Sequence, residues 1–144
     1  MVATRFAVAV HILLLLAAER TDARPTSLRL AQSVNTNPVV VRRITGLLSR
    51  AGLVRVHRGP GGAELVRNAS CITLSDVWRA VNPGKARPLL PLHARPDPLC
   101  PVGCSIQAVL GAAFGEAEHA LHAALAQTTL DTLVSGVRAR QAAA

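Results

Sequence analysis

The stretch that decides the fold is TSLRLAQSVNTNPVVVRRITGLLSRAGLVRVHRGPGG, residues 26–62. Its first part places a capping hydroxyl, Thr26, before apolar residues at helical spacing, which predicts a short helix ending near residue 34. Asn37 and Pro38 are typical of the N-cap and first residue of a second helix, and Gly52 is typical of the residue just beyond its end. Two short helices joined by a three- or four-residue turn have the layout of a helix-turn-helix.

The second helix has two chemically different faces. We expect one face to be buried, because its apolar side chains repeat at helical spacing: Val40, Ile44, Leu47, Leu48 and Ala51. The opposite face consists of Val39, Arg42, Arg43, Gly46, Ser49 and Arg50. A basic outer face on the second helix is typical of a recognition helix, which enters the major groove of DNA.

After Gly52 the chain predicts a β-hairpin. Residues 53–57 and 63–67 alternate as half-buried strands do, and Arg58-Gly59-Pro60-Gly61-Gly62 forms the tip. The tip lacks the Lys-Ser/Thr ending of a phosphate-binding P-loop and is followed by a strand, which argues against a nucleotide site. We interpret the hairpin as a wing, whose glycines permit close approach to a sugar-phosphate backbone while Arg58 enters a minor groove or holds a phosphate.

The charge distribution identifies the expected partner. The 144 residues carry a net charge of +8, and residues 1–67 hold ten arginines against three acidic residues, so net +7 lies in the N-terminal half. Only 2% of the residues are aromatic and there is no tyrosine, which disfavours the stacking platforms that hold single-stranded nucleic acid. Double-stranded DNA is therefore the expected partner. No pair or triad of hydrolytic residues stands out, so we do not expect an enzyme.

The first apolar run, residues 7–18, resembles the hydrophobic core of a secretory signal but is too short to span a bilayer. His11 interrupts it, and the charged residues 19–22 follow directly. Its apolar side chains also repeat at helical spacing: Phe6, Val10, Leu13, Leu14 and Ala17. We therefore expect a core helix in a cytoplasmic protein without a membrane partner, and the alternative is a small secreted or membrane-associated protein.

The C-terminal part has a different composition. Residues 82–101 hold six of the nine prolines and predict a linker or sensing loop. We expect Ser105 to cap a helix of about 20 residues, roughly 30 Å long, that packs against the first helix and against a second copy of the chain. Its apolar stripe is Ile106, Val109, Leu110, Ala113, Ala117, Ala120, Leu121 and Ala124. Thr128 or Thr129 should cap a short last helix through Val134, and residues 138–144 should fray.

The three cysteines leave several functions open. Cys71 lies beside the wing, whereas Cys100 and Cys104 lie in the proline-rich loop. The two loop thiols could form a redox or electrophile switch, with Cys104 activated at a helix N-terminus and Cys100 as its resolving partner. Two thiolates do not complete an iron–sulfur or zinc ligand set, so His93, Asp97 or a partner subunit would have to contribute. Inert cysteines are the third alternative.

Three motifs together resemble the Rrf-two family of winged-helix bacterial regulators: residues 26–54, the tip 58–62, and residues 72–81 (ITLSDVWRAV). The sequence departs from the family at Ala63-Glu64, where family members commonly have a glycine-flanked aromatic residue. The resemblance implies a mainly α fold with a small β-hairpin wing (α+β), comprising a winged helix-turn-helix and a long C-terminal dimerisation helix. Cluster-binding relatives have three cysteines close together before the long helix, whereas this chain has two there, which disfavours an iron–sulfur cofactor.

We therefore predict a winged helix-turn-helix domain over residues 1–82, a sensing loop over 83–103, and a dimerisation helix with a short last helix over 104–144. The expected function is that of a homodimeric repressor that binds an inverted-repeat operator, with a response to thiol oxidation as one of the alternatives left open for its cysteines. The alternative is a dimeric ligand or redox sensor that has this fold but does not bind DNA. The predicted DNA-binding residues are Thr36, Asn37, Val39, Arg42, Arg43, Arg50, Arg58 and Gly59.

Overall fold

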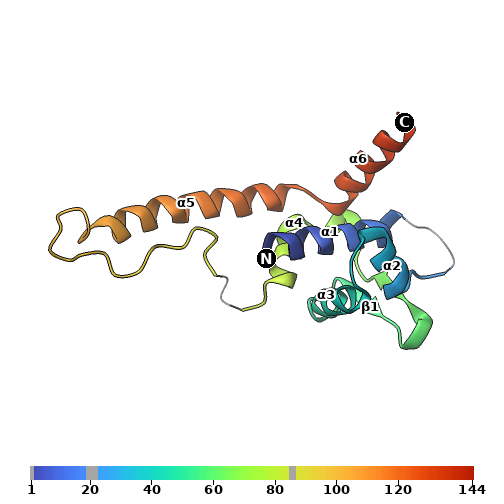
Figure 1. Cartoon of the computed structure of the whole chain (residues 1–144). Helices are drawn as coiled ribbons and strands as arrows, with labels where there is room; N and C mark the ends of the chain where they lie inside the picture. Colours follow the sequence, from blue (N-terminus) through green and yellow to red (C-terminus); the bar gives the residue numbers. More distant parts are fainter. Residues whose placement is uncertain (1, 19–22, 85–86) are drawn as a thin grey trace.

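The computed structural model describes residues 2–18, 23–84 and 87–144 (Figure 1). The chain is mainly α-helical with one small antiparallel hairpin, as the sequence predicts for a winged helix-turn-helix with a long C-terminal helix. The charged residues 19–22 lie outside the described residues. The elements are α1 Val2–Ala18, α2 Ser27–Val34, α3 Pro38–Arg50, β1 Val54–Val56, η1 Gly59–Gly61, β2 Ala63–Leu65, η2 Ala69–Cys71, α4 Leu74–Val81, α5 Ile106–Gln127 and α6 Leu130–Ala142.

Helix α1 is the centre of the core. Ala9, Ile12 and Leu13 are completely buried, and α1 packs against α2, α3, α4, α6 and β2. The sequence placed Phe6, Val10 and Leu14 on the buried face, but they are only half-buried. The prediction missed this because α1 is apolar on nearly every side, so periodicity alone could not identify the side that meets the other helices.

Helix α3 buries Val41, Ile44, Thr45 and Leu48. The prediction of Val40 was wrong by one residue, because Val40 is 40% exposed and Val41 is fully buried. Three valines precede Arg42, and helical spacing to Ile44 and Leu48 is compatible with more than one of them. The predicted caps are confirmed: Thr26 Oγ1 accepts from Arg29 N at 3.3 Å and Asn37 Oδ1 from Val39 N at 2.8 Å, and Gly52 has φ +73°.

The predicted hairpin is present, but its strands are shorter than predicted. Val54 pairs with Leu65, Arg55 with Glu64 and Val56 with Ala63. Its second strand lies against the connection that precedes α2, because Ala63 N donates to Pro25 O at 3.2 Å. Gly62 has φ +70°, and a Cβ there would lie 2.6 Å from Arg24 O, so this close approach requires glycine.

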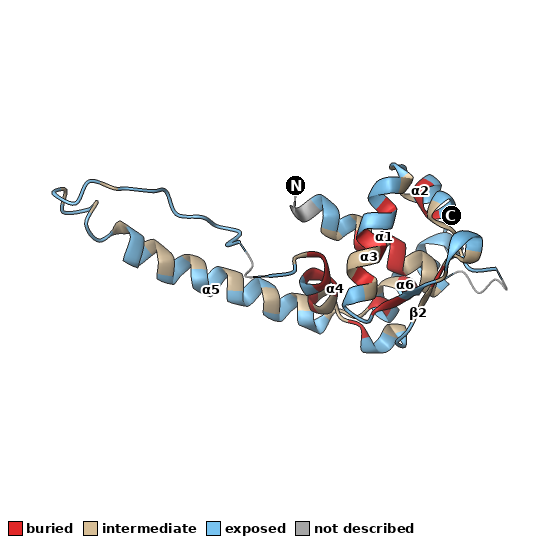
Figure 2. Cartoon of the chain, turned by 90° about the horizontal axis from the view of Figure 1, so that it is seen from below, coloured by how far each residue is buried: buried red, intermediate tan, exposed pale blue. Residues whose placement is uncertain are grey.

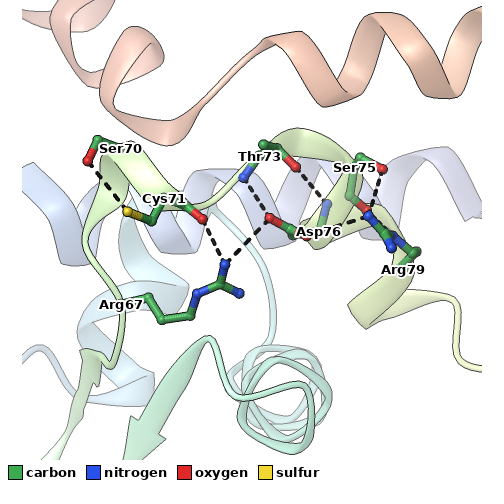
Figure 3. Close-up of polar contacts among 7 residues, drawn as sticks. All are labelled: Arg67, Ser70, Cys71, Thr73, Ser75, Asp76 and Arg79. Atoms are coloured by element: carbon green, nitrogen blue, oxygen red, sulfur yellow. Dashed lines mark hydrogen bonds and ion pairs between the residues drawn. The ribbon is translucent and has the colours of Figure 1, made fainter.

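A polar network joins the exit of the wing to α4 (Figure 3). Thr73 and Asp76 form a capping box, with Thr73 N donating to Asp76 Oδ2 at 3.0 Å and Asp76 N to Thr73 Oγ1 at 3.1 Å. Arg67 Nη2 donates to Cys71 O at 2.8 Å and lies 4.0 Å from Asp76 Oδ2. Arg79 approaches the other Asp76 oxygen at 3.6 Å. These contacts fix α4 relative to the hairpin.

Helix α5 leaves the core and extends away from it (Figures 1 and 2). Its C-terminal end is held by Leu74 N donating to Thr128 O and Leu130 N donating to Ile72 O, each at 2.9 Å. Trp78 of α4 contacts His122 of α5 at a ring-centroid distance of 6.1 Å. We expected α5 to pack along α1, but α5 packs mainly against α4, and α4 and α6 occupy the flank of α1.

Two predictions about helix ends were wrong. Ser105 makes no side-chain cap to α5, because residues 100–106 already form a turn in which Ser105 N and Ile106 N donate to Val102 O. Helix α6 continues to Ala142 rather than ending at Val134. Residues 138–142 are Arg, Ala and Gln, which favour helix. Because α6 also packs against α1, the helix extends through these residues rather than fraying.

Candidate nucleic-acid interface

The outer face of α3 carries the predicted recognition residues. Arg42, Arg43 and Arg50 are exposed, and Val39 is 53% exposed. Their backbone is held by the buried face of the same helix, so the side chains project from a rigid support. Arg50 lies in the last turn, about 18 Å along the helix from Pro38 at 1.5 Å per residue. The arginines therefore form a basic strip from Arg42 to the end of the helix.

Arg42 lies where α3 meets the wing. Its Nε donates to Ser27 Oγ at 3.4 Å. A cavity of about 260 Å³ lies between α2, α3 and the hairpin, and Arg42, His57 and Gly59 are among its lining residues. The recognition helix and the wing therefore border one continuous surface. Such a surface can contact a DNA groove and the adjacent sugar-phosphate backbone at the same time.

The turn before α3 is partly occupied by structural roles. Asn37 Oδ1 caps α3, so the amide nitrogen is the part of this side chain left for a base edge. Thr36 is half-buried, and its backbone N donates to Ala31 O at 3.0 Å. Asn35 before it has φ +57°, which sharpens the turn. These contacts fix the direction in which α3 begins.

The tip of the wing is open. Arg58 is exposed and makes no side-chain cap to the 3-10 turn that follows it. Gly59 has φ +62°, and a Cβ there would meet nothing within 4 Å, so backbone conformation rather than crowding selects glycine. The geometry leaves the Arg58 guanidinium and the Gly59 backbone accessible to a polyanion.

Sequence reasoning missed a charged cluster at the base of the wing. Glu64 accepts from His57 Nε2 at 2.8 Å and from Arg24 Nε at 3.2 Å, and Arg55 Nη1 lies 3.6 Å from its carboxylate. The hydrogen bond with His57, followed by that with Arg24, lowers the pKa of Glu64 below its usual value. The available signal was Glu64 itself, which is the only acidic residue between Asp22 and Asp76.

The two loop cysteines lie one helical turn apart. Cys104 N donates to Cys100 O at 3.0 Å, which places the two Cα atoms about 6 Å apart, within disulfide range. Backbone N–H groups of Gly103 and Val102 donate to the Cys100 sulfur and lower the pKa of that thiol. Cys104 Sγ instead donates to Pro101 O at 3.3 Å. The geometry favours Cys100 as the activated thiol, the reverse of the assignment made from sequence.

The loop does not offer a complete metal site. Within residues 2–18, 23–84 and 87–144, no three His, Cys, Asp or Glu side chains are grouped to hold a metal ion. Asp97 Oδ1 accepts from Leu99 N at 2.9 Å, and His93 is tied to α5 through its carbonyl, which accepts from Gln107 Nε2 at 3.1 Å. The donor set of one chain therefore does not fit an iron–sulfur cluster, which takes four ligands.

None of the helices within residues 2–18, 23–84 and 87–144 combines the length and the apolar character needed to cross a bilayer.

Comparisons with known proteins find one matching family profile and similar regulators. The sequence profile described as Rrf2, iron-dependent transcriptional regulator, matches residues 2–136. The chain is similar to YwnA of Bacillus subtilis (strain 168), which is named provisionally as an HTH-type transcriptional regulator. The two are 39% identical over 135 residues, which cover 94% of this chain and 98% of YwnA.

Two solved structures are similar over nearly the whole chain. One, described provisionally as a DNA binding protein, is 37% identical and covers 90% of this chain and 97% of its own, with a TM-score of 0.71. The other, described provisionally as a transcriptional regulator from Lactobacillus plantarum, is 29% identical and covers 93% of this chain and 89% of its own, with a TM-score of 0.76.

The lowered pKa of Cys100 predicts a reactivity order. In a Cys71→Ser/Cys104→Ser variant, the remaining Cys100 should be alkylated by iodoacetamide at neutral pH faster than the remaining Cys104 in Cys71→Ser/Cys100→Ser, because more of it is thiolate. When the alkylation rate is measured across a pH series, the pH at which the rate of Cys100 is half-maximal should lie below that of an ordinary thiol. The same variants in urea serve as the control and should react alike. A Cys100 midpoint in the ordinary range would contradict the assignment.

Proposed function

The chain belongs to the Rrf2 (Rrf-two) family of transcriptional regulators, and from that premise we propose that it is a homodimeric repressor that binds an inverted-repeat operator. Membership agrees with the resemblance drawn from the sequence, and the family consists of transcriptional regulators rather than enzymes. The observation that carries the proposal is the single surface formed by the basic face of α3 and the glycine-rich wing, which meet at Arg42.

Each exposed group on that surface has a role that suits its chemistry. Arginine side chains can bind guanine edges in pairs of hydrogen bonds, and an apolar side chain such as Val39 can contact a thymine methyl. Groups at the ends of the surface hold phosphates and set the register. We assign base reading to Asn37, Val39, Arg42 and Arg43, the wing contact to Arg58 with the Gly59 backbone, and phosphate contacts to Thr36 and Arg50.

The proposal of a dimer is based on helix α5, one side of which is covered by the chain itself while the other is open. One side is covered by the proline-rich segment, since Leu90 N donates to Glu118 Oε1 at 3.0 Å and Leu92 lies 3.7 Å from the Cβ position of Gly111. The other side is open: Val109 is 63% exposed, and Ala113 and Ala120 on the same side of the helix are exposed too. The 22 residues of α5 span about 33 Å, which suits pairing with the same helix of a second copy.

Two-fold pairing determines the shape of the operator. A symmetric dimer presents two copies of α3, so its half-sites must be inverted and about 34 Å, one turn of DNA, or a multiple of it apart. A dimer bound in this way within a promoter covers DNA that polymerase needs, which is why we assign repression rather than activation.

The loop thiols supply the proposed signal response. A hydroperoxide transfers oxygen to the Cys100 thiolate, giving a sulfenic acid and an alcohol or water after proton uptake. The Cys104 sulfur then attacks the Cys100 sulfur, the S–O bond breaks, and water leaves as the disulfide forms. Because the loop covers one side of α5, we propose that this bond alters the dimer. We propose no resident metal, since the residues that the structure describes bring no three donor side chains together.

The roles of two arginines can be separated by binding measurements. On an operator selected from random duplexes, Arg43→Ala should weaken binding by about 1–3 kcal/mol if it reads a guanine, while random DNA is affected less. Arg50→Ala should weaken both duplexes alike and reduce the salt dependence of binding, because a phosphate contact carries no sequence information. Fluorescence anisotropy at several salt concentrations makes both measurements.

Equal losses on both duplexes for Arg43→Ala would remove its base-reading role. Absence of salt-dependent binding by the unaltered chain would instead leave a sensor that has this fold but does not bind DNA.

The dimer surface can be tested without DNA. Val109→Glu places a charge on the open side of α5 and should give a monomer in sedimentation analysis, because burying an unpaired carboxylate opposes association. The matched control is Leu28→Glu, which changes a side chain of similar exposure (60%) on α2 and should leave the dimer intact. A Val109→Glu protein that stays dimeric would place the interface elsewhere.

A further inference from the structure

The one acidic residue on the proposed DNA-binding surface requires an explanation. Between Asp22 and Asp76 the chain has eight arginines and a single acidic residue, Glu64. A carboxylate near phosphates is repelled by them, so its charge alone would weaken binding to any DNA. Its position therefore indicates a compensating role.

Glu64 joins two arginines and a histidine that come from two parts of the chain. Arg55 and His57 lie on and just after β1, and Arg55 is the direct cross-strand neighbour of Glu64. Arg24 comes from the connection that leads into α2. Both carboxylate oxygens are used, Oε1 by His57 and Arg55 and Oε2 by Arg24. The Glu64 side chain is 35% exposed, so part of this cluster is shielded from water.

The hairpin needs such an anchor. It has only two strands of three residues each, and a two-stranded hairpin is marginally stable without further packing. Its other attachments to the connection before α2 are the Ala63–Pro25 backbone hydrogen bond and the close approach of Gly62 to Arg24 O. The Glu64–Arg24 pair lies beside these contacts. It therefore holds the wing against the segment that begins the helix-turn-helix.

We propose that Glu64 is a positioning and specificity-determining residue for DNA binding, which holds Arg24, Arg55 and His57 so that the wing keeps a fixed place relative to α3. The inference rests on the proposed function. The pairing has a second effect, because it occupies two guanidinium groups that would otherwise contact phosphates of any sequence. Glu64 thus strengthens binding to the operator and weakens binding to random DNA.

The proposal and simple electrostatics predict opposite signs on the operator. If Glu64 acts only as a negative charge, its neutralisation strengthens binding to every duplex. If it positions the wing, neutralisation weakens operator binding while it strengthens random binding. The ratio of the two affinities therefore separates the explanations.

The test uses Glu64→Gln in the whole chain, with Asp131→Asn as the control. Asp131 is exposed in the first turn of α6, so this control makes the same charge change away from the wing and from the open side of α5. In anisotropy titrations Glu64→Gln should bind the operator roughly fivefold more weakly and random DNA roughly threefold more tightly, as expected for losing partly exposed ion pairs and freeing arginines. Asp131→Asn should leave the ratio unchanged.

A second variant distinguishes positioning from a general structural fault. Arg24→Gln should also weaken operator binding, and the double variant should be little worse than either single one, because the two groups act as a pair. Tighter binding of Glu64→Gln to both duplexes, or the same change in Asp131→Asn, would overturn the proposal.

A DNA-free measurement keeps the inference separate from the proposed function. Hydrogen exchange at the His57 and Ala63 amides should be faster in Glu64→Gln than in the unaltered chain, while exchange in the α3 core stays the same. Unchanged exchange at both amides would overturn the positioning role even if DNA binding holds. Absence of DNA binding with faster exchange would instead count against the proposed function alone.

Discussion

The burial of Val41, Ile44 and Leu48 against the rest of the core is the constraint on which the account depends. Once these side chains are inside, the helical period leaves Arg42, Arg43 and Arg50 outside. The caps at Asn37 and Gly52 fix where the helix begins and ends. The buried apolar face of α3 thus determines which way the basic face points, because both faces belong to the same short helix.

The wing and the C-terminal helices are held in place relative to α3 by a few specific contacts. The wing is attached through Glu64 and the Gly62–Arg24 contact, so it borders α3 at Arg42. The Thr73–Asp76 capping box and the two hydrogen bonds between residues 72–74 and 128–130 carry the constraint on to the C-terminal helices. The direction of α5 is therefore linked to the same core that orients α3, which gives a physical connection between the proposed dimer helix and the proposed DNA-binding surface.

Local signals in the sequence predicted most of the fold. Caps, glycines and prolines placed the helix-turn-helix and the hairpin, because they act within a few residues. Contacts between distant segments were not predictable in the same way. Glu64 meets Arg24 across 40 positions, and the choice of Val41 over Val40 depends on what α3 packs against. The lowered pKa of Cys100 was not predictable for a similar reason, since it depends on how the turn after Cys100 directs the backbone N–H groups of Val102 and Gly103 towards its sulfur.

The most direct test of the central claim is hydrogen exchange of the full chain, measured alone and with a duplex selected from a random pool. If α3 and the wing bind DNA, the duplex should slow exchange at the first turns of α3 and at residues 57–63, while the buried core is already protected and changes little. Protection confined to α5 and the proline-rich segment, with none at α3 or the wing, would contradict the account.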